Sequence, residues 1–160
     1  MANYFLTMET PIGLMKLCSD EAHLKSVFFD TETSDTSSPL PEILIQTRKQ
    51  LEEYFNGTRK EFDLSLDPDG TEFQRQVWKE LEKVPYGVTR SYIEIARNLG
   101  SERASRAVGM ANGRNPVSII IPCHRIIGKN GKLTGYAGGM ERKKWLLIHE
   151  QRSSLKSRLF

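Results

Sequence analysis

The tetrapeptide Asp-Pro-Asp-Gly at residues 67–70 is the feature that most limits how this chain of 160 residues can fold. Proline has no backbone N–H and a fixed φ angle, and Asp-Gly favours a tight turn, so neither a helix nor a strand continues through this point. The patterns on its two sides also differ, with mostly strand-like alternation before it and mostly helical spacing after it. We therefore predict an α/β (α+β) protein with two domains, at residues 1–70 and 71–160.

The first part of the chain carries the patterns of a small sheet and one helix. Three short apolar stretches within residues 4–30, separated by turn-forming residues, are typical of a three-stranded meander. Apolar residues at helical spacing predict a helix over residues 41–55, which Asn56 and Gly57 would end. Alternating apolar residues predict a further strand over residues 62–66.

The second part begins with a run of helical patterns. Thr71 starts a helix that continues to about Glu82, and a capping sequence at Ser91 opens another helix that Gly100 ends. A third helix over residues 101–111 follows almost at once. The last two helices therefore predict a helix-turn-helix, whose second helix is rich in arginine and small residues.

Beyond the helix-turn-helix, strand-like patterns return before a final helix. The β-branched and apolar residues 117–121 predict a buried strand, which Pro122 interrupts before residues 126–127 resume it. The last helix is expected over residues 140–150, with residues 151–160 as a frayed basic tail.

Charge is divided unequally between the two parts. Up to Gly70 there are 6 basic and 13 acidic residues, a net charge of −7, whereas from Thr71 onward there are 17 basic and 7 acidic residues, a net charge of +10. An excess of Lys and Arg on one domain is typical of proteins that bind a phosphate backbone, because each neutralised phosphate releases condensed counterions. A solvated basic surface is the alternative explanation of the charge alone.

Composition excludes several classes of protein. A hydrophobic content of 38% and a mean hydropathy of −0.47 indicate a folded globular chain rather than a disordered one. No apolar run approaches the roughly 18 residues of a membrane span, and the N-terminus does not resemble a signal peptide, so we expect a cytoplasmic protein with no membrane partner. The two cysteines, Cys18 and Cys123, show no metal-binding spacing, so we expect thiols and no metal.

The sequence Pro122-Cys123-His124 places an imidazole next to a thiol. A cysteine attacks as its thiolate, and a neighbouring histidine can accept the thiol proton. Consecutive side chains on an extended strand point to opposite faces, so the transfer needs a turn at Pro122 or a bridging water. Glu150, at the expected end of the last helix, is the candidate carboxylate that orients His124, because a helix C-terminus also favours positive charge. A buried, unreactive cysteine beside a surface histidine is the alternative.

Residues 121–127, Ile-Pro-Cys-His-Arg-Ile-Ile, resemble the active-site signature of the O6-alkylguanine-DNA alkyltransferases, or methylated-DNA–protein-cysteine methyltransferases. Further motifs resemble that family in the same order. They are Ser91-Tyr92, Ser-Arg-Ala-Val-Gly at 105–109, Asn115-Pro116, Gly-Tyr-Ala-Gly-Gly at 135–139 and Trp-Leu-Leu-Ile-His-Glu at 145–150. The resemblance implies a ribonuclease-H-like first domain, a winged-helix-like second domain with the helix-turn-helix, and no fused regulatory domain.

The resemblance implies direct-reversal DNA repair without a cofactor. Cys123 would take a methyl or larger alkyl group from O6 of guanine, with O4 of thymine left open as a second substrate, once per molecule and irreversibly. His124, through a water and with Glu150 behind it, would generate the thiolate. Tyr92 would offer a proton to guanine N3, and Asn115 would hold the turn around the nucleophile. The expected partner is double-stranded DNA carrying O6-alkylguanine, bound by a monomer without an obligate protein partner.

The same resemblance implies how the DNA is held. No side chain reaches O6 inside a stacked duplex, so the nucleotide must be flipped out, and Arg106 would fill the gap from the minor groove. Ser91, Tyr92, Ser105 and Ala107 would contact the DNA with it.

The resemblance also implies a pocket for the flipped base. Its expected residues are Pro122, Ile126, Tyr136, Ala137 and Gly138. The carbonyls of Cys123 and Ile126 would accept hydrogen bonds from the exocyclic amine of guanine. Ala137 stands where some relatives have a serine, so a backbone amide would replace the serine hydroxyl as the donor to O6.

Three other functions stay open from the sequence alone. One is a damage-binding module similar to the alkyltransferase-like proteins, which lack the cysteine, and the presence of Cys123 argues against it. Another is a cysteine hydrolase built on Cys123 and His124, which would need repeated turnover and an oxyanion hole. The third is a winged-helix transcription regulator in which Cys123 is incidental.

Overall fold

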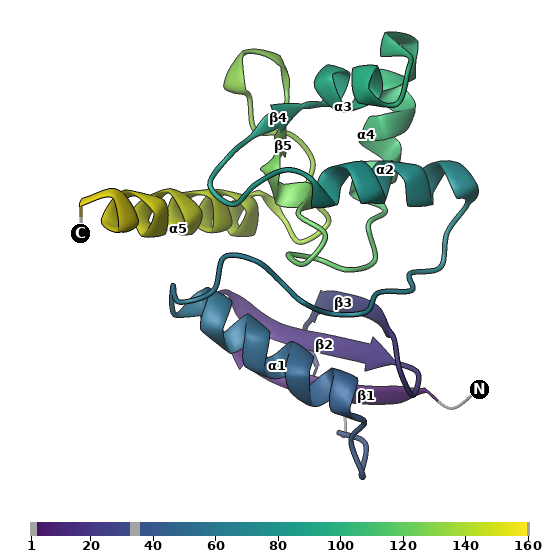
Figure 1. Cartoon of the computed structure of the whole chain (residues 1–160), viewed down its shortest axis with the longest axis vertical. Coiled ribbons are helices and arrows are strands. Elements are labelled where there is room, and N and C mark those ends of the chain that lie inside the picture. The colour runs from purple at the N-terminus through teal and green to yellow at the C-terminus, as the bar shows by residue number, and fades with distance from the viewer. Residues whose placement is uncertain (1–2, 33–35, 160) are drawn as a thin grey trace. The chain divides into compact units, whose positions relative to one another are not determined.

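The chain folds into two compact units, Met1–Asp69 and Gly70–Phe160. The computed structural model describes residues 3–32 and 36–159, with the side chains of Asn130 and of residues 154–159 left out. Figure 1 shows the course of the chain through both units.

The first unit is built on an antiparallel sheet with the order β1-β2-β3. Its strands are β1 (Tyr4–Thr10), β2 (Gly13–Ser19) and β3 (Leu24–Asp30). Leu6 pairs with Leu17, and Met15 with Phe29. Leu6, Met15 and Leu17 are buried, because alternate residues of a strand point to the same face. The predicted three-stranded meander is confirmed.

One helix, α1 (Glu42–Phe55), lies along one face of this sheet (Figure 1). Leu44, Leu51 and Tyr54 are completely buried on one side of the helix, as their helical spacing predicts. Gly57 follows with a φ angle of 86°, a left-handed conformation that glycine adopts without strain, and the helix ends there as expected.

The strand predicted over residues 62–66 does not form. The segment makes a single isolated bridge, in which Leu66 pairs with Leu24 of β3. The amide of Leu24 donates to the Ser65 carbonyl at 2.8 Å, and the amide of Asp67 donates to the Leu24 carbonyl at 2.9 Å. Pro68 then follows and has no N–H to continue the ladder, so the pairing stops after one residue.

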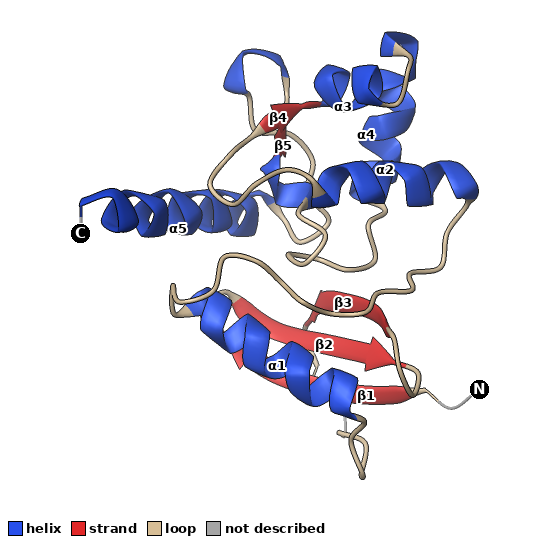
Figure 2. Ribbon diagram, viewed as in Figure 1, coloured by secondary structure: helices blue, strands red, loops and turns tan. Residues whose placement is uncertain are grey.

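The second unit is mainly helical, as the colours of Figure 2 show. Its helices are α2 (Glu72–Glu82), α3 (Tyr92–Asn98), α4 (Ser105–Gly113) and α5 (Met140–Leu159). Short 3₁₀ turns are η1 (Glu102–Ala104), η2 (Cys123–Arg125) and η3 (Lys129–Gly131). Two short strands, β4 (Arg90–Ser91) and β5 (Ile126–Ile127), pair in parallel.

Capping residues set the starts of the helices. Thr71 and Gln74 form a reciprocal capping box at the start of α2. Ser91 caps α3 by accepting a hydrogen bond from the Glu94 amide at 3.2 Å. Trp78 of α2 is buried and donates to the Ala111 carbonyl of α4 at 2.9 Å, which ties the two helices together.

Helices α3 and α4 pack against each other as the predicted helix-turn-helix. Gly100, with a φ angle of 97°, makes the turn that follows α3. The second helix begins later than predicted, since its expected first turn is the 3₁₀ turn η1 and α4 itself starts at Ser105.

The buried strand predicted over residues 117–121 is instead a buried turn. The side chain of Asn115 holds it, donating to the carbonyls of Val117 at 3.3 Å and Ile121 at 2.8 Å and accepting from the Val117 amide at 3.0 Å. Ile119 has a φ angle of 71°, which is strained for a β-branched residue. Apolar content indicated burial correctly, but the asparagine bonds outweigh strand propensity.

The last helix does not end at Glu150, because α5 continues to Leu159. The prediction of a frayed tail from residue 151 was therefore wrong for its backbone. Glu150 lies inside the helix, so its effect on His124 does not come from a helix C-terminus. Among the described residues, no helix has both the length and the apolar character required to cross a membrane.

Candidate active site

Cys123 sits at the start of the 3₁₀ turn η2, directly after Pro122. Its side chain is buried, with 3% of the residue exposed. The Cys123 amide donates to the Ile121 carbonyl at 2.8 Å, and the Arg125 amide donates to the Pro122 carbonyl at 3.0 Å. A turn at Pro122, one of the two predicted ways in which the thiol proton could reach His124, is thus present.

Burial makes the thiol of Cys123 a poor acid on its own. It raises the pKa of Cys123 to about 11, while Asn115, Lys143 and the amides of the turn act in the opposite direction without cancelling it. A free thiolate is therefore scarce at neutral pH. Attack requires a base that takes the proton during the reaction.

The candidate base, His124, is completely buried and bonded to Glu150. The His124 Nε2 and Glu150 Oε2 atoms lie 2.7 Å apart. Burial lowers the pKa of His124 below its usual value even though Glu150 raises it. The ring is therefore neutral at pH 7. Among the residues that the structure describes, its Nδ1 atom has no hydrogen-bond partner.

Arg125 also binds the Glu150 carboxylate. Its Nε atom donates to Glu150 Oε1 at 2.9 Å and its Nη2 atom to Oε2 at 3.0 Å. Burial alone would raise the pKa of Glu150, but His124 and Arg125 hold it well below its usual range. Arg125 is not among the site residues predicted from the sequence, although its place directly after Cys-His was a signal.

Two asparagines position the backbone near Cys123. Asn115, predicted for this role, holds the turn of residues 117–121. Asn112 of α4 was not predicted, and its Nδ2 atom lies 3.4 Å from the Cys123 carbonyl. Its Oδ1 atom is buried without a partner among the described residues. The Cys123 carbonyl therefore already receives one donor.

Lys143 of α5 is the most unexpected member of the site. It is completely buried, and its Nζ atom donates to the carbonyls of Ile126 at 2.5 Å and Thr134 at 2.6 Å. Burial lowers its pKa to about 8, while Cys123 opposes this shift. Lys143 thus joins β5 to the loop before Tyr136 and puts a cation near the thiol.

The glycine-rich loop predicted as part of the pocket lies close to Cys123. Tyr136 is buried, and burial together with the nearby Cys123 raises its pKa, so its hydroxyl keeps its proton. Ala137 is exposed and Gly138 is half-buried. The Gly138 carbonyl accepts a hydrogen bond from Arg142 Nη1 at 3.0 Å. The loop therefore offers a wall and backbone groups beside the thiol.

Tyr92 lies at the start of α3, where Ser91 caps the helix. Its hydroxyl and the Thr134 Oγ1 atom are 2.8 Å apart. A Cβ atom added at Gly109 of α4 would lie 3.7 Å from the Tyr92 ring, in ordinary van der Waals contact, so α4 passes close to this ring without requiring a glycine there.

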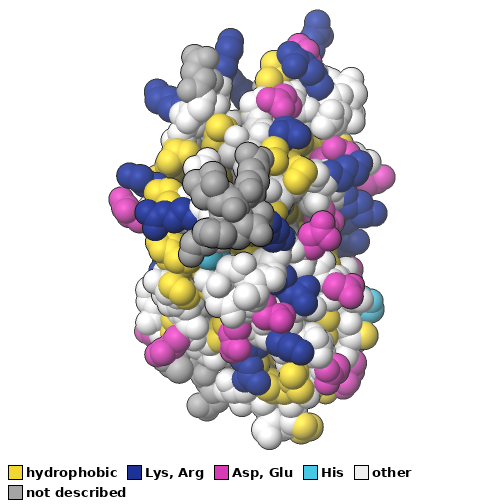
Figure 3. Space-filling view, turned by 60° about the vertical axis from the view of Figure 1, so that its left-hand side comes forward, with side chains coloured by type: hydrophobic (Ala, Val, Ile, Leu, Met, Phe, Trp, Pro, Cys, Tyr) yellow, Lys and Arg dark blue, Asp and Glu magenta, His cyan; other side chains and the backbone are white. Residues whose placement is uncertain are grey.

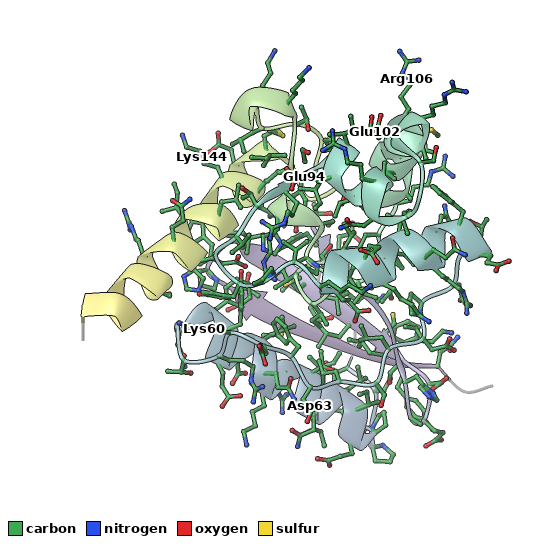
Figure 4. The ribbon with its side chains drawn as sticks, turned by 45° about the horizontal axis from the view of Figure 1, so that its top comes forward. Lys60, Asp63, Glu94, Glu102, Arg106 and Lys144 are labelled. Atoms are coloured by element: carbon green, nitrogen blue, oxygen red, sulfur yellow. The ribbon has the colours of Figure 1, made fainter. Side chains whose placement is uncertain are left out.

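The residues predicted to contact DNA lie at the start of α3 and on α4, in the second unit. Arg106 and Ala107 are exposed on α4, and Ser91 and Ser105 are half-buried. Arg106 points away from the ribbon in Figure 4. Lys and Arg side chains protrude at the end of the second unit that carries α3 and α4 (Figure 3). This surface suits a polyanion.

Fold and site together define a class of protein. A helix-turn-helix with exposed arginine stands in the same unit as a buried cysteine, a neutral histidine and an ionised glutamate. This is the arrangement of a DNA-binding protein that carries out chemistry with a thiol.

Family comparisons agree with this class. The profile "6-O-methylguanine DNA methyltransferase, DNA binding domain" matches residues 72–152, and "6-O-methylguanine DNA methyltransferase, ribonuclease-like domain" matches residues 3–68. The chain belongs to the 6-O-methylguanine DNA methyltransferase family.

Individual relatives cover nearly the whole chain. The methylated-DNA–protein-cysteine methyltransferase of Methanosarcina acetivorans is 51% identical over 149 residues, which cover 90% of this chain and 96% of the relative. The constitutive enzyme of Bacillus subtilis is 43% identical and covers 98% of this chain and 99% of its own length. A crystal structure of Mycobacterium tuberculosis OGT in complex with DNA is similar with a TM-score of 0.85 and 47% identity, covering 93% of each chain.

Proposed function

We propose that this protein repairs DNA by moving a methyl group from O6 of guanine to Cys123, once per molecule. The contact of His124 with Glu150 carries the proposal, because it prepares a neutral base next to a thiol that cannot ionise by itself. The names of relatives at 43–51% identity support methyl transfer over hydrolysis or binding alone. Thymine O4 adducts are a second substrate to test.

The reaction follows from the charges in the site. The Cys123 thiol proton passes to Nδ1 of His124 through one water, while Glu150 stabilises the imidazolium that forms. The thiolate attacks the methyl carbon, an S–C bond forms, and the C–O6 bond breaks with its electron pair moving to guanine. Tyr92 offers a proton to N3 as negative charge develops on the base. The thioether has no bond that this site can hydrolyse, so Cys123 is not regenerated.

We infer that α4 brings the lesion to the site. Arg106 fills the space of the flipped nucleotide from the minor groove, with Ser91, Ser105 and Ala107 contacting the backbone around it. The base enters the pocket of Pro122, Ile126, Tyr136, Ala137 and Gly138. The Ile126 carbonyl already accepts from Lys143, so it uses its second lone pair for the guanine amine.

The remaining proposals concern how the protein works as a whole. Residues 71–160 carry DNA binding and chemistry, residues 1–70 form a separate domain, and the protein acts as a cytoplasmic monomer without a cofactor or an obligate protein partner. The chemistry above supports the absence of a cofactor, because thiol, base and carboxylate all come from this chain.

Intact mass and peptide mapping test the proposal. The protein is incubated with a duplex containing O6-methylguanine, beside a Cys123→Ser variant. We expect a gain of about 14 Da, a methyl replacing a hydrogen, confined to the Cys123 peptide and absent from the variant. A bound duplex that keeps its methyl group, with no change in protein mass, would instead establish a damage-binding protein without chemistry.

A further inference from the structure

The exposed side of α4 carries one large apolar side chain, Met110. It is 63% exposed, more than any other large hydrophobic residue that the structure describes. A single exposed methionine is ordinary on a protein surface, so exposure alone means little. The other exposed residues of α4 indicate what Met110 contacts.

The exposed residues of α4 form a narrow strip. They are Arg106, Ala107, Met110 and Gly113, with Arg114 directly after the helix. At 100° per residue these positions fall within about a third of the helix circumference. The strip has cations near its ends, Met110 in the middle and small residues between them, and α4 contains no acidic residue. Figure 4 shows Arg106 projecting from this part of the unit.

This composition fits the minor groove better than the major groove. Major-groove readers pair arginine with guanine and also place Asn, Gln, Glu or Ser against base edges; none of those four residue types is exposed on the strip, and its arginines alone would fit either groove. Minor-groove binders use arginine together with apolar side chains such as methionine. Ala107 and Gly113 allow the helix backbone to approach the groove closely.

We propose that Met110 lies on the minor-groove floor beside the lesion and makes methyl transfer depend on the flanking base pair. The proposal rests on the function proposed above, with Arg106 at the gap left by the flipped base. Met110 is one helical turn after Arg106, about 6 Å along α4. Base pairs are spaced by about 3.4 Å, so Met110 reaches the first or second pair on one side of the lesion.

The chemistry of the groove floor gives the direction of the preference. A G·C pair places the N2 amine of guanine in the minor groove, whereas an A·T pair leaves it free of donors. The thioether of Met110 is a weak acceptor, so covering that amine removes it from water without an adequate partner. Transfer is therefore slower next to a minor-groove amine, by about fivefold.

The test varies only the minor-groove amine of the base pair that flanks the lesion. Single-turnover transfer is measured on duplexes in which one flanking pair is A·T, G·C, inosine·C, which lacks the amine, or 2,6-diaminopurine·T, which adds it to A·T. Each side of the lesion is varied separately. We expect the wild-type rate to follow the amine on one side, with G·C and diaminopurine·T about fivefold slower than inosine·C and A·T.

Variants assign the effect to the side chain. Met110→Ala should reduce the dependence to less than about twofold, and Met110→Gln, whose amide oxygen can accept from the amine, should remove or reverse it. Ile45→Ala, an exposed apolar truncation on α1, is the control and should keep the wild-type pattern. Identical dependence in wild type and Met110→Ala, or equal dependence on both sides, would overturn the proposal.

Failure of the proposed function is a separate outcome. If no duplex yields methylated Cys123, that function is wrong, and affinity for the same duplexes without the lesion is measured by fluorescence anisotropy. If the affinity depends on the minor-groove amine and Met110→Ala abolishes that dependence, the minor-groove contact is still supported. If the affinity does not depend on the amine, the contact is excluded.

Discussion

The imidazole Nε2 atom of His124 lies 2.7 Å from the Oε2 atom of Glu150, and neither residue has exposed surface. Because the carboxylate is ionised, it accepts from Nε2–H and leaves Nδ1 as the basic nitrogen. This pair therefore fixes which nitrogen faces the reaction, as well as the orientation of the ring.

Glu150→Gln should slow methyl transfer by about a hundredfold or more. The amide can donate to Nε2, which reverses the tautomer, and it no longer stabilises the imidazolium. It also leaves Arg125 buried without its anionic partner, so the free energy of unfolding should fall by about 3 kcal/mol. Single-turnover kinetics with folded variant and urea unfolding measure the two effects.

Glu141→Gln is the matched control, since Glu141 is an exposed carboxylate on the same helix. It should leave rate and stability near wild type. A Glu150→Gln protein that is folded and transfers methyl at the wild-type rate would remove Glu150 from the mechanism.

The dependence of methyl transfer on pH should be a plateau that falls off at both acid and alkaline pH. The reactive state contains a thiol and a neutral histidine, and burial places the pKa of Cys123 at about 11 and that of His124 below its usual value. The single-turnover rate should thus be nearly constant from about pH 6.5 to 7.5 and fall at lower pH as His124 takes up a proton; it should also fall above about pH 8, where Lys143 loses the positive charge that favours the thiolate. A tenfold rise per pH unit between pH 7 and 9 would show instead that thiolate forms by release of its proton to solvent.

The free energy of unfolding should also fall as the pH drops below neutral. His124 has a lower pKa in the folded protein than in the unfolded chain, so the unfolded chain binds more protons once the pH drops below about 6.5. The free energy of unfolding should therefore decrease between pH 7 and pH 5. Urea unfolding at each pH measures the slope, which should be smaller in His124→Gln; an equal slope in both proteins would place the effect elsewhere.

The sequence predicted the parts of the fold and site that depend on local patterns. Alternation and helical spacing predicted the meander and α1, and the dipeptide Cys123-His124 indicated a candidate nucleophile and a candidate base. The strand expected over residues 117–121 failed because side-chain bonds from Asn115 made a turn of an apolar segment. Local propensity cannot register such a contact.

Lys143 is a residue of the candidate site that local sequence patterns did not predict. Its helix contains several basic residues, and helical spacing places Lys143, unlike the exposed Lys144, on the same face as Leu146 and Glu150, but spacing does not show which groups would bind a buried ammonium group. Only the tertiary structure shows that two backbone carbonyls, from β5 and from the loop before Tyr136, meet at its ammonium group. Buried lysines are rare, so a sequence-based prediction places a lysine at the surface unless the groups that bind its ammonium are known.

Lys143→Met should destabilise the second unit and slow methyl transfer. The methionine fills similar space but leaves the Ile126 and Thr134 carbonyls unpaired, which should lower the free energy of unfolding by about 2 kcal/mol. Loss of the cation near Cys123 should also disfavour the thiolate. Urea unfolding and single-turnover rates are compared with Lys144→Met; equal values in the two variants would mean that Lys143 contributes nothing specific.

Arg106→Ala should separate base flipping from chemistry. Without the arginine, nothing supports the gap in the stack, so transfer from O6-methylguanine in a duplex should slow by about tenfold or more. Transfer from the free O6-methylguanine nucleoside needs no flipping and should keep the wild-type rate, because Arg106 is exposed on α4 and Cys123 is buried in its own turn. Arg75→Ala, an exposed arginine of α2, controls for the loss of one positive charge. If Arg106→Ala slowed both substrates equally, Arg106 would act on the site itself rather than on the DNA stack.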